Sequence, residues 1–325
     1  MLSCGQRDAQ KVIVRAPALS ITKLPVLIAY DQGLFAKYGL DVELWMAPYG
    51  THSEAVYADP LTRLWRKTGI GTPKRPDIFV DGTTPAMVRL SQNAGVRRRV
   101  AIGGTDCDVR AHIIGRKGIA SLDELKGKRI GVTAAYTTSG FHALLLAQRM
   151  GWDPVRDVSI VGEVSDIDPL LDGSVDAMVA YEDTYARALK AGLPILADTA
   201  DWHAFIAGNS INVEAAWLKD PAHRETARRF MKAIAEGTAV YFKQPEIALQ
   251  AMEKWYGISD REFLKTLYAR GAWLPKKPYA CHEGIAKTME LYDSNEMRRY
   301  KPEDFYDDSI MAEIDHEGFF DTLYK

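Results

Sequence analysis

The strongest constraint on this chain is a β–α alternation that fills its first hundred residues and then begins again. Short apolar or β-branched segments are followed by a polar turn and then by a helical pattern, as in parallel strands joined by helices. In the first block we expect strands at 12–14, 41–45, 77–80 and 100–102. In the second block we expect them at 129–132, 158–161, 177–180 and 194–196. The pattern predicts an α/β fold with mixed, mostly parallel sheets.

After residue 204 the alternation gives way to one helix after another. Apolar residues recur there at spacings of three and four, and Gln244-Pro245 interrupts the pattern. Two β–α blocks followed by a helical return predict two lobes, with the chain crossing between them near 103 and near 204. We therefore expect residues 1–103 and 204–325, with the C-terminal helices, to form one lobe and residues 104–203 the other.

The charge and the cysteines exclude several functions. Lys and Arg number 41 and Asp and Glu 43, a net charge of −2, so nothing favours nucleic acid or an anionic membrane as a partner. The sequence contains no run of about 18 apolar residues, the length that would predict a membrane span. Cys4, Cys107 and Cys281 are scattered, which predicts neither a disulfide framework nor a metal site. We expect no cofactor and no metal.

The first residues contain Leu-Ser-Cys-Gly, which resembles the end of a bacterial lipoprotein signal. In such a signal the cysteine, here Cys4, carries the lipid. The basic and apolar regions that should precede it are absent from this sequence. We expect a periplasmic protein or a lipoprotein anchored through Cys4, with a cytoplasmic protein as the alternative.

A polar junction separates the strand that ends near Val132 from the next helix. It reads Tyr136-Thr137-Thr138-Ser139-Gly140, which offers several hydroxyl groups and no charge. Ligands of open α/β sheets bind at the carboxyl ends of strands, and a helix N-terminus there favours an anion. One helix cap needs only one hydroxyl. We therefore expect Thr137, Thr138 and Ser139 to line a ligand cleft; the alternative is that they only cap the helix.

Several segments, in order along the chain, resemble one family. "ALSITKLPVLIAYDQGLFAKYGLDVEL", "GIASLDELKGKRIGV" and "DAMVAYEDTYARALKAG" resemble periplasmic solute-binding proteins of the sulfonate, nitrate, taurine and thiamine-precursor type. The resemblance implies the two-lobed periplasmic-binding-protein-like fold of type 2, with a ligand cleft between the lobes. It also implies a small-molecule ligand and an ABC permease as partners.

The same resemblance implies where the ligand is contacted. The expected positions follow strands or the second crossing; they are Ser20, Ile21, Thr22, Gly82, Thr83, Thr84, Tyr181, Glu182 and Asn209. The alternative for each is an ordinary turn hydroxyl or a surface charge. An acidic residue at this rim fits a ligand with hydrogen-bond donors, such as a heterocycle, better than a bare oxyanion.

The stretch "GTHSEAVYADPLTRLWR" resembles a segment of the biphenyl sulfinate desulfinases, which share this fold and hydrolyse a carbon–sulfur bond. His52 and Arg63 match the histidine and arginine of those enzymes. Their nucleophile is a cysteine, and Ser20 stands at the matching position here. An enzyme using Ser20, His52 and Arg63 is therefore the alternative function. In a receptor, the same His52 and Arg63 would hold a carboxylate or sulfonate.

Aromatic residues also gather near the expected cleft edges. Tyr49, Trp202 and Phe205 would suit a flat ligand, whereas Trp45 is explained as well by core packing. The interpretation is a solute-binding component of an ABC importer that captures a sulfonate, an aromatic acid or a pyrimidine-like molecule.

Overall fold

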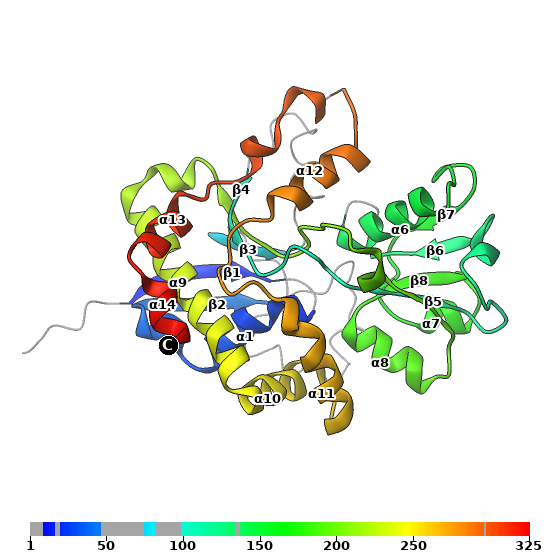
Figure 1. The fold of residues 1–325 in the computed structure, drawn as a ribbon, viewed down its shortest axis with the longest axis horizontal. Coiled ribbons are helices and arrows are strands. Elements are labelled where there is room, and N and C mark those ends of the chain that lie inside the picture. The colour runs from blue at the N-terminus through cyan, green and yellow to red at the C-terminus, as the bar shows by residue number, and fades with distance from the viewer. Residues whose placement is uncertain (1–8, 17–19, 47–74, 82–98, 134–136, 296) are drawn as a thin grey trace, which may run out of the picture.

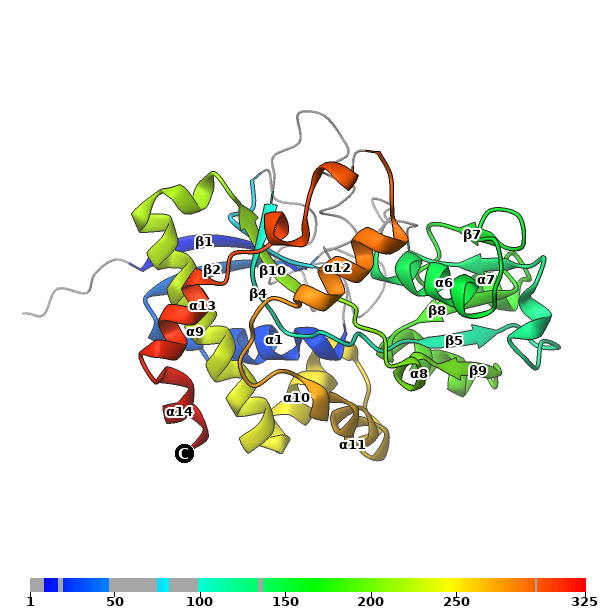
Figure 2. The ribbon, with the colours of Figure 1, turned by 45° about the horizontal axis from the view of Figure 1, so that its top comes forward.

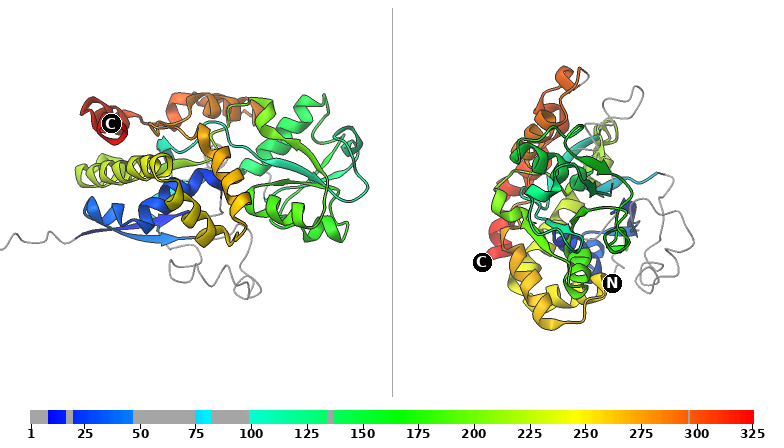
Figure 3. Two further views of the ribbon diagram at one scale, coloured as in Figure 1. Left: turned by 60° about the horizontal axis from the view of Figure 1, so that its bottom comes forward. Right: turned by 90° about the vertical axis from the view of Figure 1, so that its right-hand side faces the viewer.

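The computed structural model describes residues 9–16, 20–46, 75–81, 99–133, 137–295 and 297–325. In these residues the chain forms two five-stranded sheets, each with helices packed against it. We call the part built on the first sheet the first lobe and the part built on the second sheet the second lobe. Figure 1 shows the first lobe on the left and the second on the right, and Figure 3 gives two further views. The expected two-lobed α/β fold is confirmed.

The sheet of the first lobe has the strand order β2-β1-β3-β10-β4. β1 is parallel to β2 and β3, whereas β10 is antiparallel to β3 and β4, so four of the five strands run in one direction. The strands are β1 Gln10–Arg15, β2 Leu40–Trp45, β3 Ile78–Asp81, β4 Arg99–Gly104 and β10 Ser210–Glu214.

The sheet of the second lobe repeats this plan with the order β7-β6-β8-β5-β9. β6 is parallel to β7 and β8, and β5 is antiparallel to β8 and β9. All four residues of β5 and of β8 are buried, as expected of central strands covered on both faces. The strands are β5 His112–Gly115, β6 Arg129–Gly131, β7 Ser159–Val161, β8 Ala177–Ala180 and β9 Ile195–Asp198.

Helices of the first lobe come from both ends of the chain. α9 begins after Asp220, whose carboxylate accepts a hydrogen bond from the Ala222 N–H, and it packs along α1. Phe35 stacks on Phe230 with ring centroids 4.9 Å apart, in the core between α2 and α9. The helices are α1 Leu24–Asp31, α2 Leu34–Lys37, α9 Pro221–Lys243, α10 Pro245–Tyr256, α11 Arg261–Arg270, α12 His282–Leu291, α13 Ser309–His316 and α14 Phe319–Tyr324.

The described residues of the second lobe contain three α-helices. Between β5 and β6 the chain forms one short 3-10 turn, η3 Asp123–Leu125. The helices are α6 Thr138–Arg149, α7 Asp168–Leu171 and α8 Glu182–Lys190. None of the helices in the described residues is both long enough and apolar enough to span a membrane.

Two chain segments connect the lobes. We call residues 105–111, between β4 and β5, the first crossing, and residues 199–209, between β9 and β10, the return crossing. They lie side by side: the Thr105 N–H donates to the Asn209 carbonyl at 3.0 Å, and the Ile206 N–H donates to the Cys107 carbonyl at 3.1 Å. α12 of the first lobe reaches α6 of the second, so the lobes also meet through helices (Figure 2).

Candidate ligand cleft between the lobes

On the first-lobe side, the chain leaves β1 and forms the short 3-10 helix η1, Ile21–Lys23. The Ser20 hydroxyl lies 2.7 Å from the Thr22 hydroxyl, and the Tyr256 hydroxyl donates to the Ser20 carbonyl at 2.7 Å. Ile21 and Thr22 are buried, and Ser20 is half-buried. Three predicted ligand contacts are therefore held together at the end of a parallel strand.

Lys23 and Asn209 join this turn to the return crossing. The Lys23 ammonium donates to Asn209 Oδ1 at 3.1 Å, and Asn209 Nδ2 donates to the Thr22 carbonyl at 3.0 Å. Burial lowers the pKa of Lys23 to about 8, although Asp81 and Asp106 oppose that shift. The predicted ligand contact Asn209 is thus joined to η1, and its partner Lys23 was not predicted from the sequence.

On the second-lobe side, α6 begins at the polar junction. Thr137 stands at the N-cap position with extended backbone, but its side chain makes no capping hydrogen bond. Its hydroxyl instead lies 2.9 Å from the Ser139 hydroxyl, which accepts a hydrogen bond from the Thr133 N–H at 3.0 Å. The Thr137 side chain therefore does not cap α6, and the ligand contact expected of residues 137–139 stays a prediction.

Thr138 connects α6 to the return crossing. Its hydroxyl donates to the Gly208 carbonyl at 3.4 Å. A Cβ atom on Gly208 would come within 1.9 Å of a Val109 methyl carbon and 3.0 Å of a Thr138 methyl carbon. Because position 208 is glycine, Val109 of the first crossing and Thr138 of the second lobe can both lie close to the return crossing.

Glu182 reaches across from the start of α8 to the first lobe. Its Oε2 accepts a hydrogen bond from the Ile21 N–H at 3.4 Å, and the side chain is buried. Burial raises the pKa of Glu182 to about 7, because the desolvation of the charged form outweighs the attraction of Arg270. Its neighbour Tyr181 is half-buried and packs edge-to-face on His142 at 6.2 Å.

A second interaction between the lobes lies close by. Arg270, at the end of α11, forms a two-point ion pair with Asp198, at the end of β9, and one of its contacts is 3.1 Å. His112 lies 3.6 Å from the Asp198 carboxylate and stacks on Tyr185. Burial and the neighbouring Arg270 lower the pKa of His112 to about 4, so it is neutral near pH 7. Sequence patterns gave no signal for this group, because its members are far apart in the chain.

Several predicted residues lie outside the described residues: Tyr49, His52, Arg63, Gly82, Thr83 and Thr84. The desulfinase-like arrangement of Ser20, His52 and Arg63 therefore stays a prediction. For Ser20 itself, the side-chain partner in the structure is the Thr22 hydroxyl, which is not a base.

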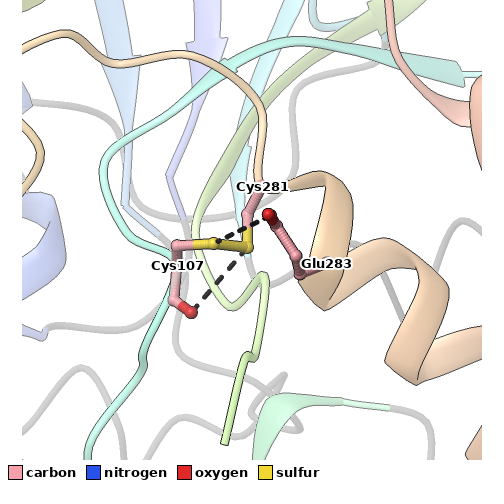
Figure 4. Close-up of side chains that lie close together, drawn as sticks. All are labelled: Cys107, Cys281 and Glu283. Carbon is pink, nitrogen blue, oxygen red and sulfur yellow. Dashed lines mark hydrogen bonds between the residues drawn. A yellow bond between two sulfur atoms is a disulfide. The ribbon is translucent and has the colours of Figure 1, made fainter.

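The expectation about the cysteines is wrong. Cys107 in the first crossing and Cys281 before α12 form a disulfide between residues 174 positions apart (Figure 4). Glu283 points toward it, with Oε2 4.0 Å from Cys107 Sγ. Two thiols and a carboxylate in this arrangement have the chemistry of metal ligands, but sulfurs joined to each other offer no thiolate. The bond ties the base of α12 to the first crossing.

Comparison with known proteins supports the resemblance. The family model described as NMT1/THI5 like matches residues 111–248, a span from the start of the second lobe into α10. A comparison with curated proteins finds no match.

Solved structures extend the likeness over nearly the whole chain. The nitrate-binding protein NrtA from Synechocystis PCC 6803 has a TM-score of 0.70 and 12% identity, over 95% of this chain and 89% of its own. The aliphatic sulphonate binding protein SsuA from Escherichia coli has a TM-score of 0.61 and 14% identity, over 87% and 91%. A DszB mutant in complex with biphenyl-2-sulfinic acid has a TM-score of 0.59 and 14% identity, over 94% and 99%.

At such identities the solved structures show only that the fold is shared. They do not show which ligand this chain binds. They include a nitrate-binding protein, a sulphonate-binding protein and a DszB mutant in complex with biphenyl-2-sulfinic acid. The chain thus has the fold of the periplasmic binding proteins, and the match over residues 111–248 confirms its resemblance to the NMT1/THI5-like type.

Proposed function

We propose that this protein is the solute-binding component of an ABC importer and closes its two lobes around one small organic molecule. The observation that carries the proposal is that η1 in the first lobe contacts the start of α8 in the second, while the start of α6 contacts the return crossing. The Ile21 N–H meets Glu182 there, and Thr138 meets the return crossing. Ligands of open α/β sheets bind at such strand ends.

The chemistry of the cleft favours a ligand with two kinds of polar group. The start of α6 offers peptide N–H groups and hydroxyls, which suit an anionic or carbonyl oxygen. Glu182 offers a carboxyl group, which suits a hydrogen-bond donor such as an amino group or a ring N–H. A pyrimidine-like molecule or an aromatic acid with a donor meets both demands, and a bare oxyanion meets only the first.

We further propose that the protein acts outside the cytoplasm. The Cys107–Cys281 disulfide supports this location, because disulfides persist in oxidising compartments such as the bacterial periplasm. Attachment through a lipid on Cys4 is supported by the Leu-Ser-Cys-Gly pattern alone. The mass of the mature protein extracted from membranes tests this attachment directly.

Thermal denaturation in the presence of candidate ligands tests the binding function. The set comprises aryl sulfonates, aryl sulfinates, aromatic carboxylates, alkyl sulfonates and aminopyrimidines. A ligand at 100 times its Kd stabilises the folded state by about 2.7 kcal/mol, which is readily measured. We expect one class to raise the Tm of the wild type, and to raise that of Glu182→Gln less.

Asp168→Asn, which changes an exposed carboxylate on α7, is the control and should respond as the wild type does. A set in which no class raises the Tm contradicts the proposal. A ligand that stabilises Glu182→Gln as much as the wild type contradicts the assigned role of Glu182.

A further inference from the structure

A cavity separate from the ligand cleft lies between the two lobes on the α12 side. Its volume is about 560 Å³, within the usual range for small-molecule sites. One wall is the C-terminal half of α6, the other is α12, and the floor is residues 202–205 of the return crossing. The cleft residues Thr138, Glu182 and Asn209 are not part of its lining. Figure 2 shows the two helices side by side here.

Aromatic rings line the floor of this cavity. Phe205 leaves 55% of its surface exposed, which is unusual for so large an apolar side chain. Trp202 also belongs to the lining. The Arg149 guanidinium lies over the Trp202 ring, 5.4 Å from the ring centroid. Both aromatic residues were expected at a ligand site from the sequence, and the structure places them here instead of among the cleft contacts.

The two basic side chains of the cavity differ in whether a carboxylate is paired with them. Lys287 on α12 is paired with Glu290 at 2.6 Å. Arg149 on α6 is exposed, and among the described residues no carboxylate lies within ion-pair distance of it. A guanidinium held over an aromatic ring and lacking a carboxylate partner is suited to a carboxylate or sulfonate.

The walls are held in place by covalent and backbone features. The disulfide ties the first turn of α12 to the first crossing, next to Glu283 of the lining. His203, on the floor, has a φ of 49°, the left-handed region that residues other than glycine seldom adopt. The cavity is therefore a built feature of the junction between the lobes.

We infer that this cavity is a second ligand site, which takes a small aromatic anion with its ring on Phe205 and Trp202 and its charge on Arg149. Because the walls belong to different lobes, a bound molecule contacts both. Its binding is thus linked to the angle between the lobes, and by reciprocity to ligand binding in the cleft.

Isothermal titration with 2-naphthoate tests the site. We expect the Kd for Arg149→Gln to be at least tenfold higher than for the wild type, because the charge-assisted contact is lost. Arg156→Gln is the matched control, since Arg156 is an exposed arginine of the same lobe paired with Asp153, and its Kd should equal that of the wild type. Glu182→Gln, which alters the predicted cleft, should keep 2-naphthoate binding, with a smaller change in Kd than Arg149→Gln shows.

Phe205→Ser provides a second variant that removes the ring without touching a charge, and it should weaken binding as well. Absence of binding to the wild type at millimolar 2-naphthoate overturns the inference. So does equal binding by the wild type and Arg149→Gln. Binding lost in Glu182→Gln and kept in Arg149→Gln would assign the probe to the cleft, which overturns the second site and leaves the proposed function intact.

Discussion

Arg270 of the first lobe and Asp198 of the second form a two-point ion pair, with Nη2 3.1 Å from Oδ1. The pair links the end of α11 in the first lobe to the end of β9 in the second. Both side chains keep part of their surface exposed, so the pair contributes modestly to stability and acts mainly by holding the lobes together.

Replacing Arg270 by glutamine should therefore open the cleft without unfolding the protein. We expect a larger radius of gyration in small-angle X-ray scattering and weaker binding of the cleft ligand. The free energy of unfolding should fall by no more than about 1 kcal/mol. Lys265→Gln, on an exposed pair of the same helix, should change neither quantity. An unchanged radius and affinity in Arg270→Gln would show that the ion pair does not hold the lobes.

Glu182 should make stability depend on pH. Its pKa is about 7 in the folded state, above the ordinary value of 4.5, so its contribution is complete below about pH 4.5 and is lost as pH rises through 7. In Glu182→Gln the side chain does not titrate, so the free energy of unfolding should not fall in this way as pH rises. Relative to the wild type, the variant should gain up to roughly 3 kcal/mol between pH 4.5 and 8. Urea denaturation at several pH values measures the difference, and a difference that is flat with pH would contradict the buried placement of Glu182.

The disulfide should stabilise the protein. Cys107 and Cys281 are paired, so alkylation under denaturing, non-reducing conditions should leave both of them unlabelled. The double variant Cys107→Ser and Cys281→Ser should lose about 2–5 kcal/mol of unfolding free energy. Dithiothreitol should lower the Tm of the wild type and leave that of the double variant unchanged. Labelling of Cys107 and Cys281 in protein from an oxidising compartment would refute the bond.

Asn209 should be needed for the cleft floor. Asn209→Ala removes the acceptor of the buried Lys23 ammonium and the donor to the Thr22 carbonyl. An unsatisfied buried polar group costs about 1–3 kcal/mol, so chemical denaturation should show a loss of that size. Gln32→Ala, which removes an exposed amide, should be neutral. A loss of stability no greater than that of Gln32→Ala would contradict the network.

The sequence predicted the parallel strands well, because each lies next to its own helix along the chain. It missed β5 and β10, the antiparallel strand of each sheet. β10 pairs with β3 and β4, more than a hundred residues earlier, and β5 has only four residues, all buried. Neither strand has a local alternation or turn that would reveal it.

The same limit applies to the cleft. Thr137, Thr138 and Ser139 are predicted from a local run of hydroxyls at a strand end, and Glu182 from its place after a strand. Lys23 and Arg270 were missed, because their polar partners lie far away along the chain. Lys23 donates a hydrogen bond to Asn209, and Arg270 forms an ion pair with Asp198. The pairing of Cys107 with Cys281 crosses 174 positions for the same reason. Packing between lobes leaves no periodic mark in the sequence.

Native mass spectrometry tests the central claim most directly. The purified protein is incubated with the pooled ligand set, the complex is isolated, and the bound molecule is released and weighed again. A solute receptor should hold one molecule per chain and release it with its mass unchanged. A released mass that differs from every added compound, or steady depletion of one compound, would contradict a solute receptor and favour turnover involving Ser20 and His52.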